Sequence, residues 1–479
     1  MMQNLLLAFS ALLSLGDPVA DAPRIAVELV PAITRAEIEA HVRFLAADER
    51  KGRFTGSPEA ELCARYMAEV FARQGLAPAG DDGTYLQRVP LSKTSWSAAP
   101  ELALTPTGGE TSAFAYGRDF DGGNGYPAAL DLALVVASSE ADLPKADLAR
   151  TALFFDGSTT QRKRAFEAAG LGAGESLGLL LVPGFDESPA RPATVPRGRL
   201  ELASRARSES VRPVRVHGAA LKKLRQSGGA RLAFDPHVTR EEVGASNVAA
   251  KLVGVGTPEQ PELASEAIVV TAHYDHLDGH HARGGPGVDT IWNGADDDAS
   301  GCAAVLEIAG ALAHEKPPAR TIIFLLVTGE EIGLLGTDHY LDAPIVPLER
   351  TVLNLNFEMI GRPDDKIGGS GKLWLTGYDL SSLGAACAAA KIAVLADPYP
   401  NEHFFERSDN IAFVRRGVVG QTLSSYNLHK DYHQPSDEAD TLDYVHMEAC
   451  TRAGLEALKL VSSGALRPAW IAGKEPKRR

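Results

Sequence analysis

Two adjacent glutamates, Glu330 and Glu331, follow an apolar run over residues 321–328 that is typical of a buried strand. Two like charges this close repel each other, and burial at the mouth of a strand disfavours the charged form of both. A metal cation would remove this conflict, because one carboxylate could bind the metal while its neighbour handles protons. A solvated turn at the start of a helix is the alternative, since acidic side chains suit a helix N-terminus. The pair alone favours this alternative, so other segments must decide.

Two further predicted strands also end in residue types that bind metals. The apolar run 267–272 is followed by His273 and Asp275, and the run 351–357 is followed by Glu358. In an open α/β sheet, sites form outside the carboxyl ends of the strands. We therefore expect these side chains to gather near Glu330 and Glu331.

A helix start and a loop contribute the remaining candidates. Asp297 precedes residues 302–314, where apolar side chains recur at helical spacing. His433 follows Tyr432 in a loop bounded by proline, and His429, four residues earlier, is the alternative candidate. Imidazoles and carboxylates together suit zinc.

Five motifs occur in a fixed order: His-x-Asp, Gly-Ala-Asp-Asp-Asp-Ala-Ser-Gly, Gly-Glu-Glu-x-Gly-Leu-x-Gly, Glu-Met-Ile-Gly and Tyr-His-x-Pro-x-Asp. In this order they resemble the co-catalytic two-zinc aminopeptidase family, which also includes glutamate carboxypeptidases, glutaminyl cyclases and the transferrin receptor. The resemblance runs from His273 to Asp443 and implies two zinc ions per chain. His273 and Glu358 would bind the first zinc, Glu331 and His433 the second, and Asp297 would bridge both.

The same resemblance implies roles for residues beside the metals. Glu330 would be the general base that takes a proton from the bridging water and passes it to the leaving amine. Asp275 would accept a hydrogen bond from the ring of His273, which fixes the tautomer of that ring. Tyr432 would help to polarise the substrate carbonyl, and the peptide bond after Asp297 would be cis.

One position departs from the common pattern. Many relatives have Asp where this chain has Glu358, whose side chain is longer by one methylene group. The Pro-x-Asp that follows His433 favours this histidine over His429 as the ligand. We expect His276, His280 and His281 to be solvated in a Gly-rich loop, with the rim of the substrate cleft as the alternative position for this loop.

Other functions on the same scaffold remain open. A glutaminyl cyclase would use one zinc and would not need the full set of five ligands. A glutamate carboxypeptidase would need arginines to hold the carboxylate of its substrate. Candidates for that role near the motifs are Arg362, Arg407, Arg415 and Arg416. A non-catalytic binding protein is disfavoured, because every ligand position is filled.

A different chemistry is suggested by residues 174–178, which match the Gly-x-Ser-x-Gly nucleophile elbow of serine hydrolases. That motif needs a strand before the serine and a helix after it. Here a helical stretch, residues 162–169, comes before, and an apolar strand, residues 179–182, comes after. The order disfavours a serine nucleophile.

Composition limits the classes of partner. The 479 residues carry a formal net charge of −14, which argues against nucleic acid and anionic membranes as partners. Peptides are the substrates that the family resemblance implies. The four cysteines show no metal-binding spacing and no disulfide framework. The oligomeric state stays open.

The chain is long enough for two domains. Residues 1–22 resemble a secretory signal, which predicts a soluble protein exported to the periplasm or the medium. Residues 23–113 and 240–465 should form an α/β peptidase domain with three α/β/α layers and a mixed, mainly parallel central sheet. Residues 114–239 contain no metal motif and resemble a smaller, β-rich protease-associated domain. A basic tail, residues 466–479, ends the chain.

Overall fold

A computed structural model describes residues 31–123, 126, 128–144, 148–170, 177–185, 198–208, 213–278 and 288–476. The predicted signal segment, Ser176 of the Gly-x-Ser-x-Gly motif, His280 and His281 lie outside the described residues. Among the described helices, none is long and apolar enough to cross a membrane.

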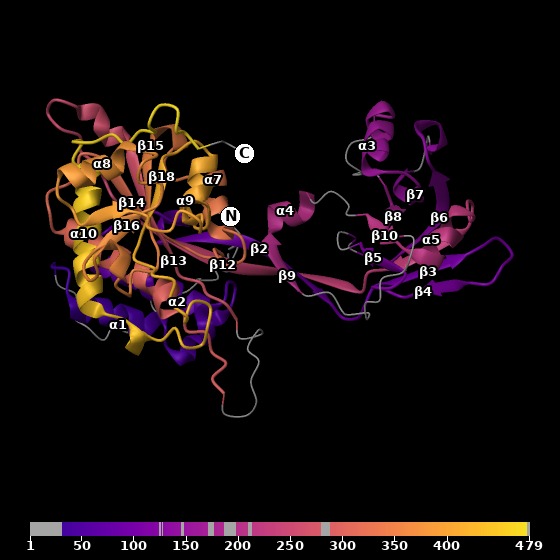
Figure 1. Cartoon of the computed structure of the whole chain (residues 1–479), viewed down its shortest axis with the longest axis horizontal. Helices are drawn as coiled ribbons and strands as arrows, with labels where there is room; N and C mark the ends of the chain where they lie inside the picture. Colours follow the sequence, from indigo (N-terminus) through magenta and orange to yellow (C-terminus); the bar gives the residue numbers. More distant parts are fainter. Residues whose placement is uncertain are drawn as a thin grey trace, which may run out of the picture. The chain divides into compact units, whose positions relative to one another are not determined.

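The chain divides into two compact units (Figure 1). Unit 1 comprises residues 1–89 and 244–479, and unit 2 comprises residues 90–243. We expected the insertion to span 114–239, but the structure places its start earlier. The two boundaries fall inside long strands, β2 (Leu86–Trp96) and β12 (Val238–Leu252). A strand that continues through a boundary leaves no turn or composition change there, which is why the sequence pattern located the start too late.

Unit 1 is built on a mixed sheet whose central strands are parallel. These strands are β13 (Ala267–His273), β14 (Thr321–Val327), β15 (Thr351–Phe357) and β18 (Gly420–Ser424). In the order β18-β15-β13-β14 each pairs in parallel with its neighbour. Outside them, β12 pairs antiparallel with β14, and β16 (Leu373–Leu375) pairs antiparallel with β18. The short strands β17 (Val394–Ala396) and β1 (Ala77–Pro78) extend the sheet at β16 and β12. The expected mixed, mainly parallel sheet is thus confirmed.

Helices cover both faces of this sheet, because both faces of β13 are apolar. Ile268, Val270 and Ala272 pack into one buried cluster, whereas Ala267 and Val269 pack into another. The alternation follows from the two-residue period of a strand. Helices with residues in the first cluster are α1 (Arg35–Leu45), α2 (Pro58–Arg73), α6 (Gly301–Ala313), α8 (Ser382–Ala389) and α10 (Tyr444–Ser462). The second cluster contains residues of α7 (Leu335–Asp342) and α9 (Asn410–Arg415).

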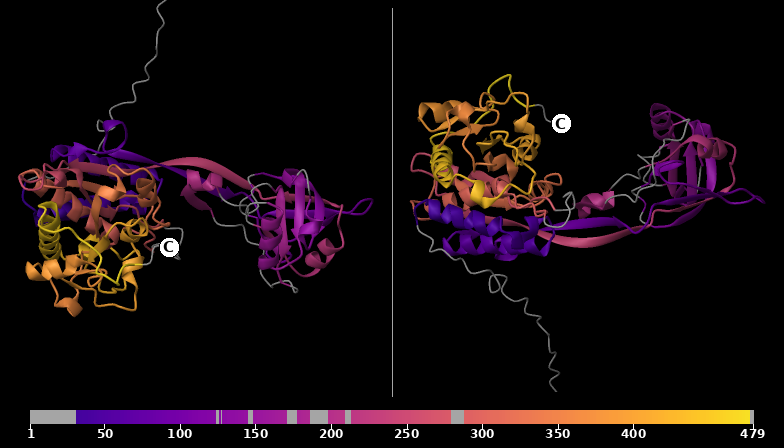
Figure 2. Two further views of the ribbon diagram at one scale, coloured as in Figure 1. Left: turned by 90° about the horizontal axis from the view of Figure 1, so that it is seen from above. Right: turned by 60° about the horizontal axis from the view of Figure 1, so that its bottom comes forward.

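One helical layer of unit 1 can be followed in Figure 2. In the right-hand view of Figure 2, the indigo helices α1 and α2 lie together along one side of unit 1.

Side chains of Thr34 and Ser57 accept hydrogen bonds from the first turns of α1 and α2, and Asp443 does the same for α10. These N-caps satisfy main-chain N–H groups that have no partner within the helix.

Unit 2 has its own mixed sheet, in the order β4-β3-β11-β6-β7-β8-β10-β5. Its parallel strands are β6 (Leu130–Ala137), β7 (Thr151–Phe155), β8 (Leu179–Pro183) and β10 (Val214–Val216). The antiparallel strands are β3 (Glu101–Thr105), β4 (Ser112–Phe114), β5 (Phe120–Gly122) and β11 (Arg231–Asp235). Its helices are α3 (Thr159–Ala168), α4 (Ala203–Ser208) and α5 (Gly218–Arg225), and β9 (Arg199–Leu202) pairs with β2. Two buried clusters form its core.

Candidate metal centre

The parallel strands bring their carboxyl ends to one edge of the sheet. His273 is the last residue of β13, Glu358 follows β15 directly, and Glu330 and Glu331 follow β14 after a short turn. Asp297 lies in the irregular turn 295–300 that leads into α6. The peptide bond between Asp297 and Asp298 is cis, as expected.

Around His273 and His433, the predicted ligands form two adjacent groups. In the first, His273 Nε2 lies 3.2 Å from Asp297 Oδ1 and 3.2 Å from Glu358 Oε1. In the second, His433 Nε2 lies 3.2 Å from Asp297 Oδ2 and 3.3 Å from Glu331 Oε2. The two oxygens of Asp297 therefore belong to different groups, which is the arrangement that a bridging carboxylate requires.

The spacing of these atoms fits metal ions. A tetrahedral zinc with bonds of about 2.0–2.1 Å places its ligand atoms roughly 3.3–3.4 Å apart. The nitrogen-to-oxygen distances in both groups lie close to this value. The donor set, imidazole nitrogens with carboxylate oxygens, is also one that zinc prefers.

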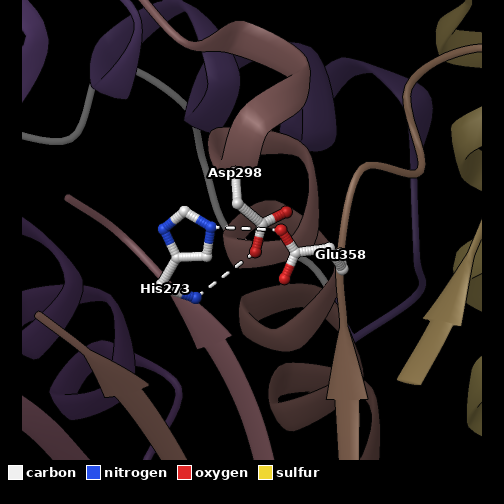
Figure 3. Close-up of side chains that lie close together, drawn as sticks. All are labelled: His273, Asp298 and Glu358. Atoms are coloured by element: carbon white, nitrogen blue, oxygen red, sulfur yellow. Dashed lines mark hydrogen bonds and ion pairs between the residues drawn. The ribbon is translucent and has the colours of Figure 1, made fainter. Parts of the chain in front are cut away.

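Asp298 also lies close to His273 and Glu358 (Figure 3). Its carboxylate, however, accepts hydrogen bonds from main-chain N–H groups, at 3.0 Å from Gly301, 3.0 Å from Met359 and 3.3 Å from His273. Asp298 is thus occupied in tying the start of α6 to the ends of β13 and β15, whereas Asp297 faces both groups.

His276 is a member of the centre that the sequence pattern missed. We expected it to be solvated, but its side chain is fully buried and its Nδ1 lies 2.7 Å from Glu331 Oε1. Together with Asp297 and Glu331 it could hold a metal ion. The only signal in the sequence was its position three residues after His273.

Glu330 lies beside the ligands in a buried and acidic environment. Burial raises the pKa of its carboxyl well above the usual value, and the nearby carboxylates of Glu358 and Asp409 act in the same direction. A carboxyl group with a raised pKa takes up a proton readily, which suits a general base. This raised pKa applies to the centre without cations. A bound cation would favour the charged carboxylate of Glu330 and so lower this pKa.

Asp275 does not hold the His273 ring in the way that we expected. The ring Nδ1 lies 3.1 Å from the main-chain carbonyl oxygen of Asp275 but 3.8 Å from its carboxylate. The carboxylate instead accepts hydrogen bonds from Thr55 Oγ1 at 3.0 Å and from the main-chain N–H of Glu330 at 3.2 Å. Asp275 therefore fixes the turn that carries Glu330, and its carbonyl orients His273.

Tyr432 packs directly on the ring of His433, a predicted ligand. Its ring is stacked on that of His433, with centroids 3.9 Å apart. Burial raises the pKa of the Tyr432 hydroxyl, so it stays protonated and can donate a hydrogen bond. A small cavity of about 40 Å³ lies beside Glu358. Aromatic residues that line it are Trp374, Phe404, Tyr426 and Tyr432.

His429, the alternative ligand, belongs to a neighbouring network. Its Nε2 lies 3.1 Å from Asp296 Oδ2, and Arg362 contacts its other ring nitrogen at 2.6 Å. Arg362 also donates to Asp437, whose carboxylate accepts hydrogen bonds from the main-chain N–H groups of Asp296 and Asp297. This network holds the turn that carries Asp297.

Of the arginines that we considered as binders of a substrate carboxylate, two form other contacts and one lines the cavity. Arg362 is engaged in the network just described, and Arg416 donates to Asp342. Arg407 lines the cavity, where its guanidinium lies 5.0 Å from the centre of the Phe404 ring. Ser408, which follows it, donates to Glu358 Oε2 and accepts a hydrogen bond from Asn356 at 2.8 Å. Neither Ser408 nor Asn356 was assigned this role from the sequence.

Comparisons with known proteins give one family. The model of peptidase family M28 matches residues 247–458. Aminopeptidase YwaD of Bacillus subtilis is 31% identical over 116 residues, which are 24% of this chain and 22% of that protein. A vacuolar membrane protease of Lachancea thermotolerans is 27% identical over 227 residues, 46% of this chain and 20% of that protein. The matches thus span only about a fifth of the length of these relatives.

Solved structures that match over most of this chain are more distant in sequence. An aminopeptidase from Aneurinibacillus sp. strain AM-1 is 18% identical with a TM-score of 0.48, and 90% of this chain and 94% of that chain are covered. BSAP, a zinc aminopeptidase from Bacillus subtilis, is 16% identical with a TM-score of 0.48, with 91% and 97% covered. Residues 247–458, which match the model of peptidase family M28, contain all of the predicted metal ligands from His273 to His433.

Proposed function

We propose that this protein is a two-zinc aminopeptidase, which removes N-terminal residues from peptides. The observation that carries the proposal is the position of Asp297, whose two carboxylate oxygens each lie 3.2 Å from a different histidine. His273 and Glu358 would hold one zinc, and Glu331 and His433 the other. The match to the model of peptidase family M28 supports the reaction class.

Bound zinc would supply a water with a pKa lowered toward about 7 and would polarise the substrate carbonyl. Glu330 would take the proton of this water and deliver it to the leaving amine. Tyr432, kept protonated by burial, would donate a hydrogen bond to the oxygen of the scissile carbonyl. The Asp275 carboxylate would hold Glu330 by accepting a hydrogen bond from the main-chain N–H of Glu330. The main-chain carbonyl of Asp275 would orient the His273 ring.

Substitution of Glu330 by glutamine tests its role as the base. Glu330→Gln should keep two zinc ions per chain, because Glu330 is not a ligand, and should lower kcat by about 10²–10⁴-fold. The matched control is Glu315→Gln, which removes the charge of an exposed glutamate paired with Lys459 and should leave kcat unchanged. Wild-type turnover in Glu330→Gln would remove this residue from the mechanism.

A glutaminyl cyclase is separated from this proposal by elemental analysis. We expect close to two zinc ions per chain, whereas a value near one would favour the cyclase. The carboxypeptidase alternative keeps one supporting observation, the position of Arg407 at the cavity.

A substrate panel separates amino- from carboxypeptidase activity. We expect release of the first residue from peptides with a free N-terminus, including C-terminal amides, and no cleavage of N-acetylated peptides. Release of C-terminal residues from the acetylated peptides would overturn the assignment in favour of a carboxypeptidase.

Two predictions from the sequence remain proposals. Residues 1–22 would direct export and be removed, which N-terminal sequencing of the mature protein from the periplasm or medium would test. Unit 2 would act as a protease-associated domain that contributes to substrate binding. Kinetics with peptides of increasing length would test this, since KM should fall with peptide length if unit 2 binds part of the substrate.

A further inference from the structure

Arg53 is a charged side chain buried completely in unit 1. It lies in the turn Asp48–Arg53, just before α2. Among the described residues, its hydrogen-bond acceptors are all main-chain carbonyl oxygens. They belong to Tyr274 at 2.6 Å, Gly294 at 2.6 Å, Leu45 at 3.2 Å, Asp297 at 3.4 Å and, by a short contact, Asn293.

Four of these five acceptors lie in the two segments that carry the predicted metal ligands His273 and Asp297, and the fifth, Leu45, ends α1. Tyr274 follows His273 directly, so its carbonyl belongs to the main chain that orients the first imidazole. Asn293 and Gly294 lead into the turn of Asp297, whose own carbonyl is another acceptor. One guanidinium therefore joins the segment of His273 to the segment of the bridging carboxylate. Because its five N–H groups form a rigid planar fork, it fixes the spacing between the segments.

The local chain is shaped to admit this group. Gly52 has a φ of +77°, and a Cβ on it would lie 2.4 Å from the carbonyl oxygen of Leu277 and 2.8 Å from that of Trp292. These two residues continue the same two segments. The turn before α2 thus approaches both of them closely enough that only glycine fits beside Arg53.

Burial of a cation is costly unless hydrogen bonds and nearby charges compensate for it. Among the described residues, no carboxylate forms an ion pair with Arg53, so the carbonyl oxygens provide its direct compensation. An apolar side chain could fill the same volume, but it could not join five carbonyl groups. The contacts therefore indicate a role in geometry rather than in packing.

We infer that Arg53 is a positioning residue of the metal centre, which sets zinc affinity by holding the main chain of His273 and Asp297 at the distance that the metals require. The inference rests on the proposed two-zinc site. Substitution of a residue that orients metal ligands without contacting the metal commonly weakens metal binding by about 10–100-fold.

The experiment compares Arg53→Lys with a matched control. Arg320 is also buried, and its guanidinium donates to the carbonyl oxygens of Val461 and Leu466 and to Glu266. It stands just before β14, at the end of that strand opposite Glu330. Arg320→Lys therefore perturbs a similar buried network away from the metal centre.

Zinc affinity is measured by competition with a chromogenic chelator, and stability by urea denaturation of the same zinc-free samples. We expect both variants to lose stability, but only Arg53→Lys to bind zinc about 10–100-fold more weakly. Should Arg53→Lys fail to fold, Arg53→Gln replaces it, with Arg320→Gln as the control, because the amide keeps two N–H donors without a buried charge.

Two results would overturn the inference while leaving the proposed function intact. In one, Arg53→Lys binds zinc as tightly as wild type although its stability falls. In the other, Arg320→Lys weakens zinc binding equally, so that loosening of the fold alone explains the loss. Failure of the wild-type protein to bind two zinc ions would instead overturn the proposed function, and the inference with it.

Discussion

Removal of the metals should destabilise unit 1 and leave unit 2 unchanged. Without cations, the carboxylates of Asp297, Glu331 and Glu358 stand close together, and Glu330 is buried beside them. Repulsion and burial both disfavour this arrangement, so zinc should stabilise the folded state strongly. No described residue of unit 2 belongs to either group of metal-binding side chains.

The size of the effect follows from the two sites. A ligand at about 100 times its Kd stabilises the folded state by about 2.7 kcal/mol, so two independent sites contribute roughly 5 kcal/mol. For a unit larger than 250 residues, 1 kcal/mol shifts Tm by about 2 °C. Chelation should therefore lower the Tm of unit 1 by roughly 10 °C.

Differential scanning calorimetry of the whole chain measures this. Each unit has buried clusters of its own, so we expect two transitions. The transition of unit 2 is identified with Phe234→Leu, since Phe234 lies in the core of that unit and the smaller side chain leaves a cavity there. After chelation, one transition should fall and the other should stay.

A matched variant tests the division between the two sites. Glu331→Gln removes a ligand of only one group, so its unit 1 transition should fall by about half as much as after chelation. The reasoning is refuted if elemental analysis shows that the metals are gone and yet neither transition has moved. An equal fall of both transitions would also refute it.

Two further predictions concern the surroundings of the centre. Gly52→Ala should lower the free energy of unfolding, measured in urea, by more than Gly229→Ala does. Both glycines have a positive φ, which costs an alanine about 1–2 kcal/mol. Only at Gly52, however, would a Cβ also clash with main-chain carbonyl oxygens. Equal losses would show that the two segments beside Gly52 yield easily. The four cysteines are free and buried, and burial raises the pKa of the Cys63 and Cys387 thiols to about 11. Ellman's reagent should therefore react with almost no thiol in the native protein and with four thiols after denaturation. Fewer than four after denaturation would indicate a disulfide.

The edge at which the side chains meet could be foreseen, because parallel strands end on the same side of a sheet. His273 and Glu358 stand at the ends of apolar runs, so their convergence follows from local patterns. The choice of His433 over His429 came from a resemblance, and the structure places His429 beside Asp296 instead.

Contacts made by the main chain escaped prediction. The family resemblance implied a hydrogen bond from the His273 ring to Asp275, and in the structure the ring nitrogen lies nearer to the main-chain carbonyl oxygen of Asp275 than to its carboxylate. Residue types reveal where side-chain donors and acceptors occur along the chain. They carry no information about which carbonyl a turn presents.

The amino-acid sequence by itself determined the parallel strands, the ligand types and the order in which they occur, because apolar periodicity and residue chemistry are local properties. Only the tertiary structure decided that His276 is buried against Glu331 and that Arg53 lies among the carbonyl groups of the two segments that carry His273 and Asp297. Tyr274 and Gly294 are more than two hundred residues from Arg53 along the chain. Such contacts depend on how α2 and the turn before it pack against the sheet. No local sequence pattern encodes a contact between residues so far apart along the chain.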